Sequence, residues 1–296
     1  MDEETLQKYL QAGKIAAEAL QYGKSLIKPD QKIIEILDKV EAKIVELGGE
    51  PAFPSQISLN EFAAHSCSDL NDQTILTDQV VKLDVGVHID GFIGDNALTV
   101  DLSGQYTDLV KASKEALAAA LKVVGPGVPL GDIGKAIHEV ITSYGYAPVK
   151  NLSGHGLGEY NIHTAPSIPN FDNGNQTELE EGQVIAIEPF ASTGAGIVQE
   201  SSPATVFTLT DERPVRDPIT RNILQEIRKY KGLPFAKRWL ERKFTPPKTN
   251  FALRTLIRND SLRQHPPLVD QTRGIISQAE HSVIIGEDNV FFTKLA

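Results

Sequence analysis

The chain has 296 residues, of which 41% are hydrophobic and 23% charged, as is ordinary for a globular protein that can bury a large core. No apolar run approaches about 18 residues, so we expect no membrane-spanning segment, and the acidic start MDEETLQ is unlike a signal peptide. The single cysteine, Cys67, cannot form a disulfide within the chain, which favours a reducing, cytoplasmic location.

The first 50 residues are predicted to form two helices. Apolar residues recur at helical spacing over residues 6–20. A second helix is predicted to begin at Pro29 and to carry an apolar stripe over residues 33–47. It should end at Gly48, because glycine favours the left-handed conformation that closes helices.

A hairpin and a second pair of helices are predicted next. Residues 80–101 alternate in polarity and turn at Asp90 and Gly91, a pattern typical of a β-hairpin. Apolar stripes then predict helices at 107–124 and 132–144. The order of two helices followed by strands therefore occurs twice, although the two halves share no convincing sequence identity.

The rest of the chain mixes strands and helices. Short apolar runs predict strands at 183–190, 196–200 and 204–209. Residues 218–243 are predicted to be helical, with a break at the prolines of 246–247, and the final segment HSVIIGEDNVFFTKL is predicted to form strand pairs. Helices combined with mostly antiparallel strands place the chain in the α+β class.

Charge is distributed unevenly along the chain. The net charge is −10, yet residues 213–263 hold 14 lysines and arginines against 4 aspartates and glutamates. Such asymmetry indicates an inserted module with a partner of its own. Its basic side chains include Arg228, Lys229, Lys231, Lys237, Arg238, Arg242 and Lys243.

Two carboxylates stand out in the apolar stretch KLDVGVHIDGFIGD. Asp84 and Asp95 point to the same face of the predicted hairpin, because side chains alternate along a strand. A four-residue loop would place them directly opposite each other, whereas a two-residue turn would make them diagonal neighbours. In either arrangement the like charges repel, so a shared proton or a cation is needed between them.

Three further polar residues lie in contexts that are otherwise apolar or rich in glycine. His155 lies between glycines in SGHGLGEY, Glu188 interrupts the predicted strand VIAIEPF, and Glu280 begins the apolar strand EHSVII. A glutamate buried in a strand is rare unless it is paired or binds a metal. Four carboxylates and one imidazole would suit two divalent ions.

The order and local sequence of these five residues resemble the metal-ligand pattern of methionine aminopeptidases, which have the pita-bread metallopeptidase fold. The matching segments are LDVGVHIDGFIGDNALTV, NLSGHGLGEYNIHTAPSIPN, AIEPFASTGAGIV and QAEHSV. The long segment between Glu188 and Glu280 resembles the type II form, in its short archaeal version. The resemblance implies a catalytic pita-bread domain of two pseudo-related halves at 1–205 and 270–296, with a basic, mostly helical type II insert at 206–269.

The resemblance also implies a role for each ligand residue. Asp84 would bind one metal with both oxygens, while Asp95 and Glu280 would bridge two divalent ions (Co, Mn, Fe or Zn). His155 and Glu188 would complete the other metal site. An ion-activated water would then attack the scissile bond.

Residues that contact the substrate follow from the same resemblance. Glu188 would shuttle a proton to the leaving amine. His65 would face the scissile peptide, and His163 would polarise its carbonyl. Phe53 and, more weakly, Ile162 would line the methionine pocket. His88, His138, His265 and His281 are interpreted as structural.

The expected activity is removal of the initiator methionine from nascent polypeptides, with a preference for a small second residue. One alternative is an Xaa-Pro peptidase of the same fold, which would use the same ligands. Another is a ribosome- or RNA-associated interaction protein, for which the basic insert would be the contact. We expect a monomer that acts on nascent N-termini and makes no membrane contact.

Overall fold

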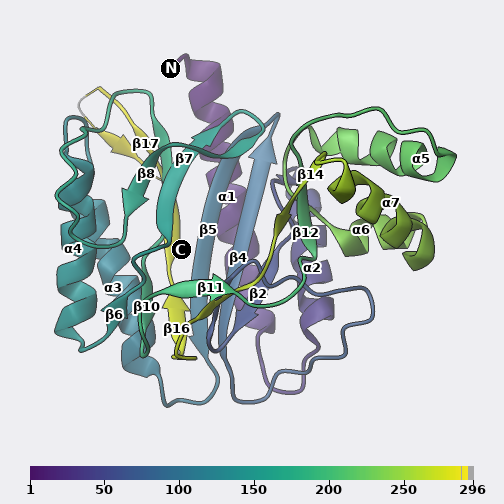
Figure 1. Cartoon of the computed structure of the whole chain (residues 1–296). Coiled ribbons are helices and arrows are strands. Elements are labelled where there is room, and N and C mark those ends of the chain that lie inside the picture. The colour runs from purple at the N-terminus through teal and green to yellow at the C-terminus, as the bar shows by residue number, and fades with distance from the viewer. Residues whose placement is uncertain (288, 293–296) are drawn as a thin grey trace.

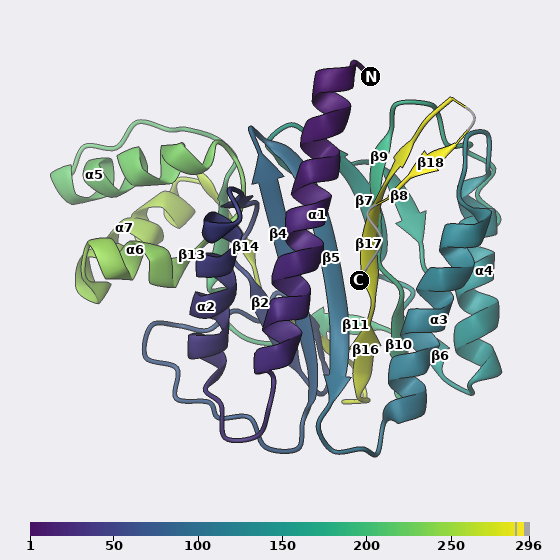
Figure 2. The same ribbon diagram turned by 180° about the vertical axis from the view of Figure 1, so that it is seen from behind.

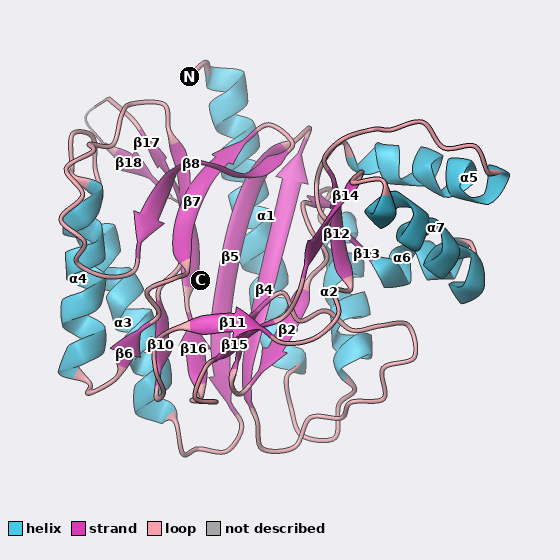
Figure 3. Ribbon diagram, viewed as in Figure 1, coloured by secondary structure: helices cyan, strands magenta, loops and turns pink. Residues whose placement is uncertain are grey.

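The computed structural model describes residues 1–287 and 289–292 (Figures 1 and 3). The first part of the chain holds α1 (Glu3–Leu26), α2 (Ile33–Glu46), β1 (Glu50–Pro51), β2 (Gln56–Leu59), β3 (Phe62–Ala64), β4 (Val80–Ile89) and β5 (Phe92–Asp101). The second part holds α3 (Thr107–Val123), α4 (Leu130–Ser143), β6 (Ala147–Pro148), β7 (Ser153–Gly158), β8 (Asn161–Pro169), β9 (Val184–Ile187), β10 (Phe190–Ser192), β11 (Val198–Glu200) and β12 (Val206–Leu209).

The last part contains the predicted insert and the C-terminal strands. Its elements are α5 (Pro218–Ile227), the short 3₁₀ helix η1 (Arg228–Tyr230), β13 (Phe235–Ala236), α6 (Lys237–Lys243), α7 (Pro246–Arg258), β14 (Leu262–His265), β15 (Leu268–Asp270), β16 (Ile276–Gln278), β17 (Glu280–Ile285) and β18 (Val290–Phe291). The predicted terminal strand pair is present, since β17 pairs with β18, whereas residues 288 and 293–296 lie outside the described residues.

A nine-stranded sheet joins the two halves of the molecule. Its main path runs β1-β4-β5-β17-β9-β7-β8, with β2 added to β4 and β18 to β17. Because β17 lies between β5 and β9, the C-terminal strand connects the first hairpin with the second. Helices α1 to α4 cover one face of this sheet, as the rear view shows (Figure 2), and the opposite face is left for the site.

Two apolar layers hold the helices to the sheet. Helices α1 and α2 pack on β2 and β4 through one buried cluster, and α3 and α4 pack on β9 and β17 through another. In β4 the residues with odd numbers, such as Leu83 and Val85, belong to the first cluster. Strand alternation therefore turns Asp84, which lies between them, to the opposite face.

The ends of the first helices follow from local hydrogen bonds. Asp2 caps α1, because its Oδ1 accepts from the backbone N–H of Thr5 at 2.8 Å. The prediction that the second helix begins at Pro29 is wrong, since α2 begins at Ile33. The backbone before Ile33 forms hydrogen bonds outside the helix, since Asp30 N–H donates to Leu76 O at 2.8 Å.

The hairpin prediction is confirmed at the level of its turn. Ile89 pairs with Phe92, so Asp90 and Gly91 form a two-residue turn. Both have positive φ, 51° and 95°, which is the conformation of a type I′ turn. The register between β4 and β5 is thereby fixed.

Two predicted elements are each divided in the structure. The strand predicted at 183–190 is split into β9 and β10, which belong to different sheets, because Pro189 lacks the N–H needed to continue a ladder. The helix predicted at 218–243 is split into α5, η1 and α6. Lys231 takes a left-handed φ of 51° there, and the prolines of 246–247 begin α7.

The segment from β12 to β14 has an apolar core of its own and is tied to α2. Its buried cluster consists of Phe207, Ile223, Leu224, Ile227, Phe235, Leu240, Ala252, Leu253, Leu256 and Leu262. Arg238, which is fully buried, donates to Glu41 on α2 and to the Cys67 thiol. Trp239 Nε1 donates to the other oxygen of Glu41 at 2.9 Å. None of the helices among the described residues is both long and apolar enough to cross a membrane.

A close backbone approach between α1 and β5 generates a stability prediction. A Cβ added at Gly94 would meet the backbone of Gly13, which cannot move aside. We expect Gly94→Ala to lower the free energy of unfolding by roughly 1–3 kcal/mol, as overpacking does elsewhere, measured by urea denaturation. Gly125→Ala is the matched control, because its nearest contact would be Val128 at 3.8 Å. Equal stability of the two variants would contradict this packing.

Candidate metal centre and active site

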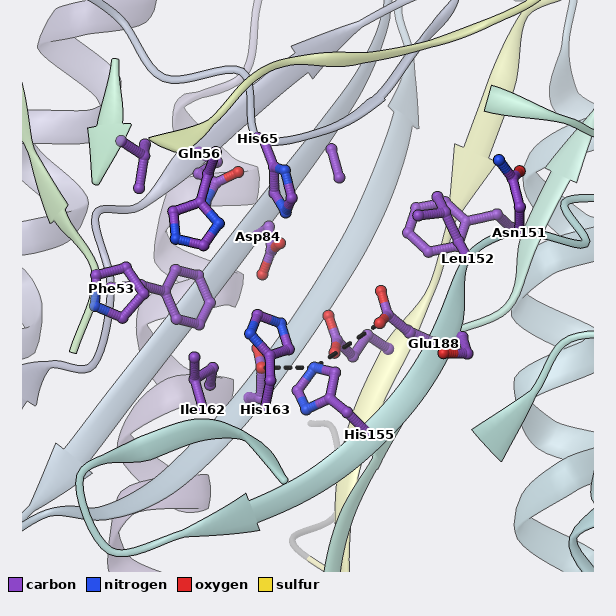
Figure 4. Close-up of a pocket in the computed structure, with 18 residues that line it drawn as sticks. Phe53, Gln56, His65, Asp84, Asn151, Leu152, His155, Ile162, His163 and Glu188 are labelled. Atoms are coloured by element: carbon purple, nitrogen blue, oxygen red, sulfur yellow. Dashed lines mark ion pairs between the residues drawn. The ribbon is translucent and has the colours of Figure 1, made fainter. Parts of the chain in front are cut away.

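The site residues predicted from the sequence line one cavity of about 230 Å³ (Figure 4). It lies on the sheet face opposite α1 to α4. The lining includes all nine predicted site residues: Phe53, His65, Asp84, Asp95, His155, Ile162, His163, Glu188 and Glu280. Side chains that are up to 227 positions apart in the chain therefore share one site.

Strand register brings the carboxylates together. Asp84 pairs with Ala97, and Ala97 also pairs with Glu280 on β17, so the small alanine separates two acidic side chains in one row. Asp95 pairs with Gly86, one step along the same face. Of the two arrangements left open above, the two-residue turn applies, and Asp84 and Asp95 are diagonal neighbours.

A second row brings His155 to the same face. Ala186 on β9 pairs with both His155 and Ser282. The Ser282 hydroxyl accepts from Asp95 N–H at 2.6 Å and donates to Asp95 O at 2.8 Å, which locks β17 beside β5. Glu188 directly follows β9, beyond the end of its ladder. Small residues between the functional ones leave the space that becomes the cavity.

The distances single out the centre of the cluster. His155 Nε2 lies 3.9 Å from Asp95 Oδ2 and 3.7 Å from Glu188 Oε1. Among the described residues, Asp95, His155 and Glu280 form a group whose possible ligand atoms all lie within 4.8 Å of one another. Asp84 and Glu188 border this group within the same cavity.

The electrostatics fit a divalent cation. Burial raises the pKa of Asp84 from 3.8 to about 7. Burial, followed by neighbouring carboxylates, raises the pKa values of Asp95, Glu188 and Glu280 well above their ordinary range. Oδ1 of Asp84 and Oδ1 of Asp95 are buried and have no hydrogen-bond partner within the described chain. Buried carboxylates without such partners are typical of groups that coordinate a metal.

The His155 ring is neutral and has one unprotonated ring nitrogen. Its Nδ1 lies 3.3 Å from the carbonyl oxygen of Gly156, and a carbonyl can only accept, so Nδ1 carries the proton. Burial lowers the pKa of His155 to about 4, which keeps the ring uncharged. Its Nε2 lone pair therefore remains for a cation, in the arrangement that metal-binding histidines commonly show.

Two other predicted histidines face the same space. His65 takes a left-handed φ of 62°, and its Nδ1 lies 3.3 Å from Pro266 O, so Nδ1 is the protonated nitrogen. The His163 ring lies 4.5 Å from the His155 ring. Burial, followed by the nearby His155, lowers the pKa of His163 to about 3. Both rings are thus neutral hydrogen-bonding groups at ordinary pH.

The cavity wall also holds residues that sequence reasoning did not nominate, among them His265 and Gln56. His265 was interpreted as structural, yet it lines the cavity, packs 5.5 Å from His65 and meets the Thr208 hydroxyl at 2.8 Å. Gln56, on β2, also lines the cavity. Neither has a local sequence signal, because both reach the site through long-range strand pairing.

Comparison with known proteins identifies the family. The profile of Metallopeptidase family M24 matches residues 7–210. This chain belongs to metallopeptidase family M24. It is 46% identical to a methionine aminopeptidase of Archaeoglobus fulgidus over 295 residues, covering 99% of both chains. It is 44% identical to a methionine aminopeptidase of Methanocaldococcus jannaschii over 295 residues, again covering 99% of both chains.

Several solved structures share the fold of this chain. A thermophilic Arx1 has a TM-score of 0.86 at 19% identity, over 99% of this chain and 91% of the other. A methionine aminopeptidase from Thermotoga maritima has a TM-score of 0.70 at 23% identity, over 99% and 97%. The prolidase from Pyrococcus furiosus has a TM-score of 0.63 at 19% identity, over 98% and 64%. The predicted pita-bread, α+β fold is confirmed, and membership of a metallopeptidase family implies that the site binds divalent metal.

The carboxylate cluster generates a prediction about pH and metal. The pKa of Asp84 is about 7 in the folded state against 3.8 ordinarily, so without metal the folded protein binds more protons than the unfolded one between these values. Stability should therefore fall as pH rises from 5 to 8 in chelator, with a decrease in Tm of about 5 °C. Added Mn²⁺ should abolish the decrease, because only the folded state offers the assembled site.

Two variants control this experiment. Asp84→Asn should show a smaller fall with pH in chelator, since it removes one of the titrating carboxyls. Asp270→Asn should keep the wild-type slope, because the pKa of Asp270 is about 2 and this group stays ionised throughout the range. A Tm in chelator that does not depend on pH would contradict the assignment.

Proposed function

We propose that this chain is a methionine aminopeptidase that removes the initiator methionine from nascent proteins. It would hydrolyse the first peptide bond and prefer a small second residue. One observation carries the proposal: the nine residues nominated from the methionine aminopeptidase pattern line one cavity, in a chain that is 46% identical to a methionine aminopeptidase over 99% of its length.

Five residues would hold two divalent ions, with Co, Mn, Fe or Zn as candidates. They are Asp84, Asp95, His155, Glu188 and Glu280. When bound, such ions polarise the scissile carbonyl and lower the pKa of water, which supplies the nucleophile at neutral pH. The support is the mixed oxygen and nitrogen donor set and the unpartnered oxygens of the two aspartates.

The protein's own groups would move the protons and orient the substrate. Glu188 is buried, and its pKa is raised by burial and then by Asp84, so its carboxyl is suited to accept a proton and pass it to the leaving amine. His163 would donate to the substrate carbonyl oxygen. His65, whose Nδ1–H is held by Pro266 O, keeps Nε2 as an acceptor for the scissile N–H.

The methionine side chain would lie against Phe53 and Ile162. Both line the cavity and belong to one buried apolar cluster. Apolar walls suit an unbranched thioether. Phe53 lies over Gly86, where any Cβ would collide with its ring, so the glycine holds open the place of the phenyl group.

We also propose the division into a catalytic unit, 1–205 with 270–296, and an insert, 206–269. The separate apolar core of the insert supports it. Val206, Pro234 and His265 of the insert nevertheless line the cavity. A monomer in the cytoplasm fits the proposed activity, and the buried, free thiol of Cys67 supports a reducing location.

The activity test uses metal add-back. Chelator-treated protein should release no methionine from Met-Ala-Ser, and activity should return with at least one of Co²⁺, Mn²⁺, Fe²⁺ or Zn²⁺. Asp84→Asn should lower kcat/KM by at least about 10³-fold while leaving the far-UV spectrum unchanged, because one ligand pair is lost. An Xaa-Pro dipeptide serves as the competing substrate. Cleavage of that dipeptide alone would favour the peptidase alternative, and no cleavage with any metal would overturn the enzyme proposal.

We further propose a transient ribosome contact through α7 of the insert. Arg238 is buried and is therefore withdrawn from the basic surface predicted above, and the other six basic side chains named there each meet an acidic or tyrosine partner. On α7, Lys248, Arg254 and Arg258 are exposed along one side and form no ion pair within the described residues. Phe251, 49% exposed, lies among them. Unpaired cations around an aromatic ring suit RNA phosphates and bases.

Co-sedimentation with ribosomes tests this contact. The triple variant Lys248→Gln, Arg254→Gln, Arg258→Gln should bind more weakly at low salt, and its salt dependence should fall by about one unit of slope per lost phosphate contact. The matched control neutralises three exposed lysines of the catalytic unit: Lys14, Lys114 and Lys122. Equal binding by both triple variants, or no salt-sensitive binding by wild type, would end the proposal.

A further inference from the structure

Gln56 occupies a position in the site that none of the assigned roles uses. It lies on β2, where it pairs directly with Asp84, so the row Gln56, Asp84, Ala97 and Glu280 crosses four neighbouring strands. Paired residues point to the same face, and Gln56 accordingly lines the cavity beside the carboxylates (Figure 4). It is only 6% exposed.

The Gln56 amide is not satisfied by the protein. Within the described residues, its Oε1 is buried and has no hydrogen-bond partner. A buried polar atom without a partner destabilises the folded state, and such atoms in native proteins are most often explained by a ligand, a catalytic role or bound water. Because Gln56 borders the cavity, a group of the substrate can supply the missing partner.

We propose that Gln56 and Asp84 together recognise the free α-amine of the substrate's first residue. This inference rests on the proposed aminopeptidase function and deepens it. The two side chains start about 5 Å apart as a cross-strand pair. Oε1 of Gln56 has no partner, and a carboxylate oxygen of Asp84 that binds a cation keeps a second lone pair for a hydrogen bond. The site therefore presents two adjacent acceptors, one neutral and one anionic.

The chemistry of the acceptors selects an amine. A free amine carries at least two N–H donors, even when its lone pair is directed at a cation, and can satisfy both oxygens at once. A peptide N–H offers one donor, and a carbonyl or a thioether offers none. An acylated amine keeps only one N–H, so one of the two acceptors would stay unpaired. The acyl group would also add bulk beside Gln56 and Asp84. The pair thus favours unblocked N-termini over blocked ones.

The alternative is that the Gln56 amide contacts the methionine side chain, since Phe53 lines the same cavity. A weak bond to sulfur would then distinguish methionine from its methylene analogue norleucine. The two roles differ in what they predict: amine recognition changes the preference for an amine over a desamino ligand, whereas side-chain contact changes the preference for sulfur over methylene.

The experiment measures binding to the metal-loaded protein by calorimetry. The ligands are L-methioninol and its desamino analogue 4-(methylthio)butan-1-ol, and the ratio of their Kd values is taken within each variant, so that changes in metal content or pocket volume largely cancel. We expect Gln56→Leu to reduce the preference for the amine about tenfold, and Gln56→Glu to retain it or increase it. Gln225→Leu, exposed on α5, is the control and should leave the ratio unchanged.

Each outcome decides the matter. If Gln56→Leu leaves the ratio of the two Kd values unchanged, amine recognition is overturned. It is also overturned if Gln56→Leu changes only the preference for L-methioninol over L-norleucinol, its methylene analogue. If wild type cleaves Met-Ala-Ser while the ratio stays constant across variants, only the assignment of Gln56 fails. If wild type neither cleaves Met-Ala-Ser nor prefers the amine, the proposed function fails and the assignment falls with it. An unfolding midpoint within about 2 °C of wild type shows that Gln56→Leu is folded.

Discussion

The burial of like-charged carboxylates on one face of a sheet is the constraint on which the rest of the site depends. Asp95, Glu188 and Glu280 are buried together, and burial followed by at least one neighbouring carboxylate raises the pKa of each. Among the described residues that line this cavity there is no lysine or arginine. Protons or metal ions must therefore neutralise the cluster. The stability of the folded state and its affinity for metal are consequently two aspects of the same electrostatic arrangement.

The fold meets this constraint by using the two faces of one sheet differently. One face is apolar and packs on α1 to α4, and the other carries the acidic rows. Ala97, Gly86 and Ala186 stand between the functional residues in these rows, and their small size provides the cavity. Strand β17 completes both rows. Glu280, and the Ser282 hydroxyl that bonds the backbone of Asp95, therefore reach the site only when β17 has paired with β5 and β9.

Local sequence predicts the parts of this site that depend on alternation and turn chemistry. The turn at Asp90 and Gly91 sets the register of the hairpin, which places Asp84 and Asp95 on one face. Sequence does not predict what depends on strands distant in the chain. The row that begins at Gln56 and the approach of His265 to His65 both require the tertiary pairing of β2, β14 and β17. Periodicity alone could not show that these distant residues come together, and they were identified through the resemblance to a known family.

The proposed insert, residues 206–269, contributes Val206, Pro234 and His265 to the wall of the cavity. Pro266, just after β14, fixes the tautomer of His65 through its carbonyl oxygen, and His265 packs on the same ring. The chain around Cys67, two residues further on, is held by Arg238 and by the Thr205 hydroxyl, which donates to Cys67 O at 2.7 Å. His65 is therefore oriented from both sides by insert residues or their immediate neighbours. A displacement of residues 206–269 at their surface would be transmitted to the His65 imidazole, because the connecting contacts are buried and closely packed.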